Sequence, residues 1–210
     1  MTMTILPRLT AILFLAAGLA YAADESPNDL VTGAINELSA ALDGRKDELA
    51  DDRDALYEVI DAILLPRFDR KYAAQLVLGQ HWRTASEEQR ERFIDAFYSA
   101  MLGKYADGVL EFEEDRIEVL AYRGDPSKKR TMVRTVVRLN DGQKVPVNYG
   151  LVQRESGWLM FDVTIEGVSY IRNFRAELDS EIRASSLEAV INRFESEASG
   201  GAAANAAASD

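Results

Sequence analysis

The 210-residue chain contains no cysteine and a single histidine, His81. Without cysteine it can form neither a disulfide nor a thiolate metal site, so a hydrophobic core must stabilise it. One histidine leaves only carboxylates as further metal ligands, and we expect no metal or other cofactor. A Ser-His-Asp triad would have to use His81, and no local motif supports one.

Positive charge and phosphate-binding loops are also scarce. The chain has 24 Lys and Arg against 35 Asp and Glu, a formal net charge of −11. It has neither a Walker loop nor a glycine-rich dinucleotide turn. The composition therefore argues against nucleic acid as a partner, and an anionic membrane surface would repel the chain.

The first 22 residues have the pattern of a cleaved secretion signal. Arg8 precedes an uncharged apolar run from Leu9 to Ala20, and Ala20-Tyr21-Ala22 has the spacing of a signal-peptidase site. The run is shorter than the ~20 residues that span a bilayer. We predict export to the periplasm with cleavage after Ala22. Cleavage removes Arg8 and no acid, which leaves 23 basic and 35 acidic residues, a net charge of −12.

Apolar periodicity predicts one α+β domain over residues 23–198. Ser26, Asp69 and Ser86 have the sequence context of helix N-caps. Period-2 segments bounded by turn residues predict a twisted antiparallel sheet of about four strands, covered by N-terminal and C-terminal helices. The strands are expected over residues 117–122, 130–139, 144–153 and 158–165. The low-complexity tail over residues 199–210 is expected to be disordered.

One face of the predicted sheet is strongly apolar. It carries Val133, Val137, Val147, Tyr149, Leu151, Leu159, Phe161, Val163 and Ile165. A helix with Phe93, Phe97, Met101 and Tyr105 on one side is expected to cover it. Periodicity alone favours a dry core, but it cannot distinguish side chains that fill a core from side chains that line a cavity.

The segment Thr164–Tyr170, with the sequence TIEGVSY, joins the last predicted strand to a helix. Ser169 lacks the flanking glycines of a nucleophile elbow. Glu166 is the one acid at this strand end that would serve as a general base, and no partner for it is visible. We expect Gly167 to permit the turn and Glu166 and Ser169 to hold it, without a catalytic residue.

Two stretches resemble a known family. They are LLPRFDRKYAAQLVLGQHWRTASEEQRERFIDAFYSAML, from Leu64, and GWLMFDVTIEGVSYIRNFRAEL, from Gly157. Their motifs resemble, in order and spacing, those of the MlaC or toluene-tolerance family, the periplasmic phospholipid-binding component of the Mla lipid-asymmetry transport system. The resemblance extends to about Glu197, and the Ala-rich tail has no counterpart in it.

The resemblance implies a lipid carrier that is not an enzyme. It implies a deep apolar pocket that holds the acyl chains of a glycerophospholipid and leaves the headgroup at the mouth. The implied partners are an outer-membrane lipoprotein–porin complex and an inner-membrane ABC transporter with an MCE-domain ring, and the carrier itself is expected to be a monomer. The residues predicted to contact lipid are Val77, Phe97, Met101, Tyr105, Val133, Val137, Val147, Tyr149, Leu151, Phe161, Val163, Ile165, Val168, Tyr170 and Phe174.

The pocket is expected to open at the seam from Gly167 to Arg175, because glycine tolerates a change of backbone dihedral angles there. Arg172 and Arg175 are candidates to bind a lipid phosphate at this mouth, although a solvated helix face explains them equally well.

Two other functions remain open from the residues alone. The first is an enzyme on a cone-shaped α+β scaffold, with Glu166 or Asp162 as base in an apolar cavity. The second is a periplasmic chaperone or lipoprotein carrier that binds polypeptide or acyl chains on an open surface.

Overall fold

The structure is a computed structural model that describes residues 25–111, 113–125 and 127–208. The predicted signal peptide lies outside the described residues. No helix within these ranges has the length and apolar character needed to cross a membrane. The helices are α1 (Pro27–Leu42), α2 (Lys46–Asp51), α3 (Arg53–Leu64), η1 (Leu65–Arg67), α4 (Arg70–Leu78), α5 (His81–Thr84), α6 (Glu87–Tyr105), α7 (Asp107–Leu110), η2 (Glu114–Arg116), α8 (Tyr170–Ala184) and α9 (Leu187–Ala208).

The strands form one antiparallel meander, which confirms the predicted α+β class. They are β1 (Ile117–Val119), β2 (Arg130–Arg138), β3 (Lys144–Arg154), β4 (Gly157–Ile165) and β5 (Val168–Ser169), in that order across the sheet. The two-residue β5 was not predicted, because so short a strand carries no periodicity. The first strand ends at Val119, earlier than expected.

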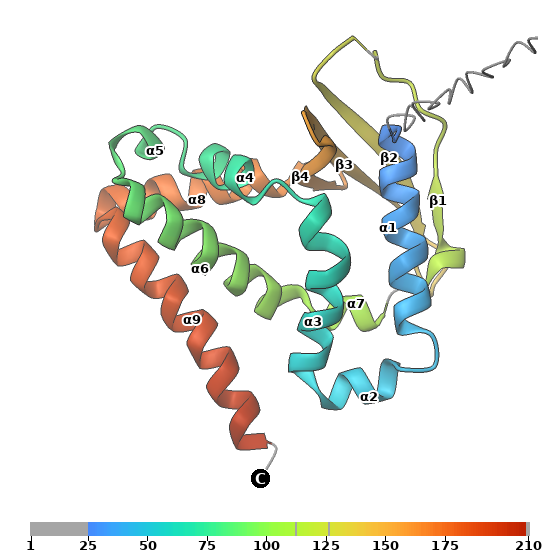
Figure 1. Cartoon of the computed structure of the whole chain (residues 1–210), viewed down its shortest axis with the longest axis horizontal. Helices are drawn as coiled ribbons and strands as arrows, with labels where there is room; N and C mark the ends of the chain where they lie inside the picture. The colour runs from blue at the N-terminus through green and yellow to red at the C-terminus, as the bar shows by residue number, and fades with distance from the viewer. Residues whose placement is uncertain (1–24, 112, 126, 209–210) are drawn as a thin grey trace, which may run out of the picture.

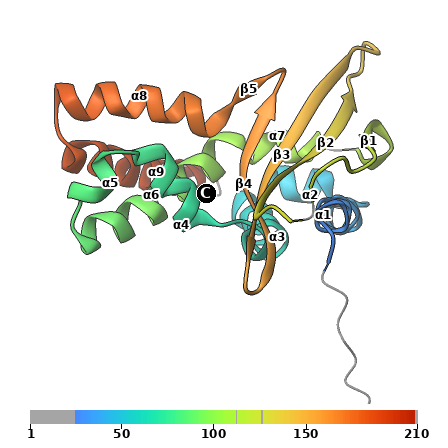
Figure 2. The same ribbon diagram turned by 90° about the horizontal axis from the view of Figure 1, so that it is seen from above.

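The elements fall into two groups joined by α3 (Figure 1). On one side α1 packs against the sheet, and on the other α4, α5, α6, α8 and α9 form a bundle. Figure 2 shows this bundle beside the β4 edge of the sheet, and α4 and α8 make its contacts with β4. The helices therefore extend the sheet sideways, rather than covering one face completely.

Helix starts agree with the predicted caps. Ser26 and Ser86 each form a capping box, Ser26 with Asp29 and Ser86 with Gln89. The Asp69 carboxylate accepts the amide of Tyr72 at the start of α4. These bonds satisfy free amides of the first turns and position α1, α4 and α6.

The tail differs from the prediction of disorder. The helix α9 continues through it to Ala208. Alanine has the highest helix propensity, and the run of alanines offsets Gly200 and Gly201, which cost about 1 kcal/mol each in a helix interior.

Buried side chains form three clusters rather than one. The first joins α4, α6, α8 and α9 around Phe93 and Phe97. The second joins α1 to β2–β4 around Val133 and Leu151. The third joins the end of α1 to α2 and α3 around Leu56. A cavity lies where the three clusters meet.

Candidate functional site

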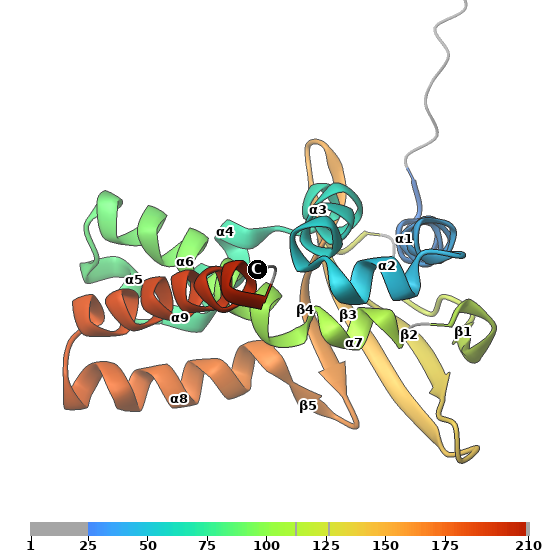
Figure 3. The same ribbon diagram turned by 90° about the horizontal axis from the view of Figure 1, so that it is seen from below.

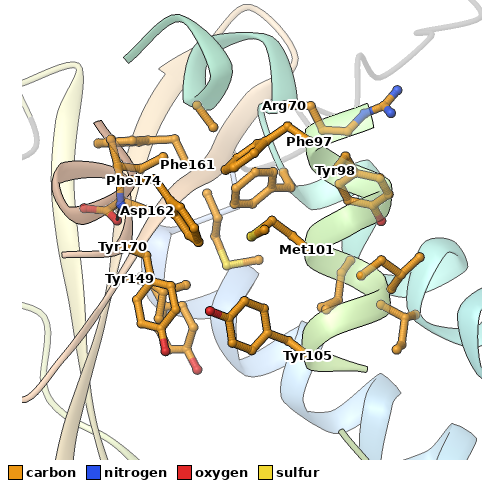
Figure 4. A pocket seen from close by; sticks show the side chains of 18 of the residues that line it. Arg70, Phe97, Tyr98, Met101, Tyr105, Tyr149, Phe161, Asp162, Tyr170 and Phe174 are labelled. Carbon is orange, nitrogen blue, oxygen red and sulfur yellow. Dashed lines mark hydrogen bonds between the residues drawn. The ribbon is translucent and has the colours of Figure 1, made fainter. Parts of the chain in front are cut away.

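The cavity has a volume of about 440 Å³ and an almost wholly apolar wall. All three clusters contribute to it, because their inward side chains do not reach across the space between the sheet, α3 and α6 (Figure 4). Its lining residues are Ile60, Leu64, Phe68, Arg70, Ala73, Ile94, Phe97, Tyr98, Met101, Leu102, Tyr105, Ala106, Val109, Tyr149, Met160, Phe161, Asp162, Val163, Ile165, Tyr170, Ile171 and Phe174. The volume lies within the ~300 to 1,000 Å³ typical of small-molecule pockets.

Many of the residues predicted to contact lipid line this cavity. They are Phe97, Met101, Tyr105, Tyr149, Phe161, Val163, Ile165, Tyr170 and Phe174. They come from α6, α8, β3 and β4, so the predicted helix and strand faces meet at one place. Whether they touch a lipid stays a prediction.

The other residues of that prediction lie elsewhere. Val133 and Leu151 are fully buried beneath α1, which closes this part of the sheet face as a dry core. Val77 is buried inside the helical bundle. Val137 and Val147 are half-buried outside the cavity wall. Val168, expected to point inward, is 59% exposed because β5 is the sheet edge.

A register shift in β4 explains further residues that the sequence pattern missed. Leu151 pairs with Met160, whereas Gly150 pairs with Asp162, so Phe161 is an extra residue in the strand. Met160 therefore shares the face of Tyr149 and lines the cavity, although strict alternation assigns it to the opposite face. Nothing in the sequence marks this bulge.

The helical walls were partly missed for a simpler reason. The predicted stripe on α6 began at Phe93, which packs against Phe194 of α9 instead. Besides the predicted Phe97, Met101 and Tyr105, the adjacent stripe that starts at Ile94 and passes through Tyr98 and Leu102 faces the cavity. A wider helix face would have included these residues. Ile60 and Leu64 belong to an apolar helix pattern in the sequence, but nothing local to that pattern shows that α3 faces the cavity.

Asp162, not Glu166, is the acid that organises the strand-to-helix junction. Its Oδ2 accepts the Ser169 hydroxyl at 2.6 Å, and its Oδ1 accepts the Ile171 amide at 3.1 Å. Ser169 Oγ in turn accepts the amide of Arg172 and caps α8. Glu166 is exposed and takes a φ of 50°, followed by Gly167 at 84°. Ser169 therefore holds the turn as predicted, but its partner is Asp162.

We predict that Asp162→Ala lowers the free energy of unfolding by about 1 to 2 kcal/mol, because Ser169 and the first turn of α8 lose their acceptor. Asp162→Asn, which keeps one acceptor oxygen, should cost less. Urea denaturation monitored by circular dichroism measures both. Equal stability of wild type and Asp162→Ala would contradict the capping role.

Two polar side chains of the wall, Tyr98 and Arg70, are engaged with acids that lie outside the cavity lining. Tyr98 donates its hydroxyl to Asp61, and burial together with this carboxylate raises the pKa of Tyr98. The Arg70 guanidinium lies over the Tyr98 ring and pairs with Asp95 at 3.2 Å. Burial also raises the pKa of Tyr149. The tyrosines thus stay neutral and present their rings to the cavity.

Tyr105 both lines the cavity and is exposed at the surface. This side chain is 40% exposed, and its ring meets Tyr170 of α8 edge-on with centroids 5.7 Å apart. Figure 4 shows Tyr105 on the α6 wall, across from Tyr149 and Tyr170. Tyr170 also contacts Phe174, which meets Phe97. The pair Tyr105–Tyr170 therefore lies between the outside and the aromatic interior.

The two headgroup candidates lie on the exposed side of α8. Neither Arg172 nor Arg175 lines the cavity. The guanidinium of Arg175 lies over Gly79, where an added Cβ would stand 2.8 Å from Nε. Their contact with a lipid phosphate stays a prediction.

His81 does not line the cavity. Its Nε2 lies 2.8 Å from Asp179 Oδ1 and joins α5 to α8. The hydrogen bond from His81, with help from Gln80 and Arg183, lowers the pKa of Asp179. Within the described ranges, no group of three or more His, Asp or Glu side chains is placed to hold a metal ion.

Comparison with known proteins assigns the chain to a family. The profile of the MlaC protein family matches residues 32–196. This chain belongs to the MlaC family. The toluene tolerance protein ttg2D of Pseudomonas putida is 28% identical over 173 residues, 82% of this chain and 80% of that protein. A second relative is the intermembrane phospholipid transport system binding protein MlaC of Haemophilus influenzae. It is 28% identical over 97 residues, which are 46% of this chain and 45% of that protein.

A solved structure of a phospholipid-binding protein has the same fold. The phospholipid-binding protein of Ralstonia solanacearum, determined in complex with a phospholipid, superposes with a TM-score of 0.74 at 21% identity. The match covers 86% of this chain and 99% of that one. The two chains therefore share one fold over most of their length.

Proposed function

We propose that the protein is a periplasmic phospholipid carrier that holds acyl chains in the cavity between the sheet, α3 and α6. The apolar cavity is the observation that carries the proposal, since its wall offers rings and aliphatic groups and no reactive centre. The phospholipid in the related R. solanacearum structure supports the choice of ligand. The family supports a role between an outer-membrane lipoprotein–porin complex and an inner-membrane MCE-domain ABC transporter.

The energetics of lipid transfer explain why a deep cavity is needed. Two acyl chains carry roughly thirty methylenes, and each costs about 0.8 kcal/mol to expose to water. The sum, on the order of 20 kcal/mol, makes unaided desorption very slow. A cavity walled by Phe97, Met101, Val163 and Ile165 returns most of this free energy, whereas a shallow groove would not.

We propose that lipid enters where the walls part between α6 and α8. Side-chain contacts such as Tyr105–Tyr170 hold these two helices together there, and such contacts separate more readily than hydrogen-bonded strands.

The hydrogen bonds of Asp162 argue against the enzyme alternative. Asp162 lines the cavity, but both of its oxygens accept hydrogen bonds at the start of α8, and Glu166 is exposed at the sheet edge. We propose that the protein has no catalytic activity of its own.

The test is uptake of a fluorescent phospholipid from vesicles by protein that has been stripped of lipid. We expect saturable uptake by the wild type, and uptake within about twofold of it for His81→Asn and Glu166→Gln, because neither residue touches the cavity. Complete loss of function in correctly folded His81→Asn would revive the enzyme alternative, and no uptake by wild type would reject the carrier.

A further inference from the structure

The face of β2 and β3 turned away from α1 is open. Along β2 the inward residues Val133 and Thr135 are 1% exposed. Met132, the residue before Val133, points to the opposite face and is 48% exposed. We call the outward set, Met132, Arg134, Val136, Arg138, Lys144 and Pro146, the outer face. In Figures 2 and 3 the β2–β3 hairpin projects beyond the helices, with α1 on the opposite side of the sheet.

The outer face concentrates positive charge in a strongly acidic chain. Arginines elsewhere, such as Arg92 and Arg193, are each paired with two carboxylates. Among the described residues, no acid forms an ion pair with Arg134, Arg138 or Lys144. Two acids are close by: Asp115 and Glu118 line the same small hollow as Arg138 and Lys144, and Glu118 is opposite Val136 in the strand register.

The register also places like charges together. Arg138 is directly opposite Lys144 in the β2–β3 ladder. Like charges at directly opposed positions destabilise a sheet. The hairpin therefore carries a repulsion that contact with an acidic surface would relieve.

The centre of the outer face is apolar. Half-buried Val136 and exposed Pro146 are opposite each other, between Arg134 and the Arg138–Lys144 pair, and exposed Met132 lies beyond Arg134 at the other end. Met and Arg are both enriched in protein interfaces relative to the rest of the surface. A membrane fits less well, because the chain as a whole is acidic and anionic lipid would repel it.

We propose that the outer face is a docking surface for an acidic surface on a partner protein of the cell envelope. It lies apart from the cavity, so a docked protein leaves the Tyr105–Tyr170 opening free. Complementary charge guides the encounter, and Met132, Val136 and Pro146 form the apolar contact.

The test compares Arg134→Glu/Arg138→Glu with a control of equal charge change, Lys71→Glu/Arg83→Glu, whose two exposed cations lie on α4 and α5. Binding is measured to vesicles from the organism's own envelope and to liposomes made from lipid extracted from them. We expect salt-sensitive binding of wild type and control to the envelope vesicles, weakened at least about tenfold in the outer-face variant. Protease treatment of the vesicles should abolish it, and liposomes should bind none of the three proteins.

Two further measurements, the thermal midpoint and lipid uptake, distinguish loss of docking from loss of the fold or of lipid binding. Arg138→Glu replaces a repulsive pair with Lys144 by an attractive one but adds an acid beside Asp115 and Glu118, so the thermal midpoint should change little while docking is lost. Uptake of fluorescent phospholipid should be unchanged, which separates docking from the carrier function. If the variant unfolds, Arg134→Gln/Arg138→Gln provides the same comparison. Equal binding by variant and control, or equal binding of wild type to liposomes, would overturn the proposal, the latter in favour of a membrane surface.

Discussion

Replacing Met101 by Trp should remove most of the phospholipid that the protein retains. Met101 projects from α6 into the cavity and is half-buried there (Figure 4). An indole in its place takes room from the acyl chains. If about three methylenes no longer fit, at about 0.8 kcal/mol each, affinity falls roughly 50-fold. Equilibrium titration of stripped protein with a fluorescent phospholipid measures this change.

Met132→Trp is the matched control, because it makes the same substitution on the outer face, where Met132 is 48% exposed. Its affinity for lipid should stay within about twofold of wild type. The indole fills empty space in the lipid-free protein, and empty cavity volume costs stability. The thermal midpoint of lipid-free Met101→Trp should therefore be equal to or above that of lipid-free wild type. Equal lipid affinity for Met101→Trp and Met132→Trp would show that the acyl chains lie elsewhere.

Tying Tyr105 to Tyr170 should trap the lipid. The sequence has no cysteine, so in Tyr105→Cys/Tyr170→Cys a cleavable bismaleimide can react only with the two introduced thiols and link them. The bridge would span α6 and α8 at the proposed opening, where the two rings now meet at 5.7 Å. We expect exchange of bound phospholipid with vesicles to slow at least about tenfold, because the walls can no longer part.

Cleaving the bridge with reductant provides the control, since it should restore the exchange rate of the unbridged double variant. Protein that is stripped before bridging should take up little lipid. Unchanged exchange in fully bridged protein would place the opening at another part of the wall.

The sequence predicted those parts of the site that depend on local patterns. Capping residues such as Ser26 and Ser86 act within one turn, so the helix starts could be predicted without tertiary information. Alternation in β4 correctly placed Val163 and Ile165 on the cavity side. Turn residues also gave the order of β2, β3 and β4.

The parts that were missed depend on tertiary packing. Val133 and Leu151 have the same alternation as Tyr149, and only the placement of α1 turns them into core. The shift between Gly150 and Leu151 brings Met160 to the cavity, and it depends on how β3 and β4 pair. Asp162 could not be recognised as the cap of α8 because it lies nine residues before Ile171, across a strand and a turn.

The most direct test of the account is organic extraction of the purified, exported protein followed by mass spectrometry. The carrier predicts glycerophospholipid bound in close to stoichiometric amount in wild type and in Met132→Trp, and strongly reduced in Met101→Trp. Lipopeptide in the extract would instead indicate a lipoprotein carrier. If folded wild-type protein yields no lipid on extraction, the central claim that this cavity carries phospholipid is contradicted.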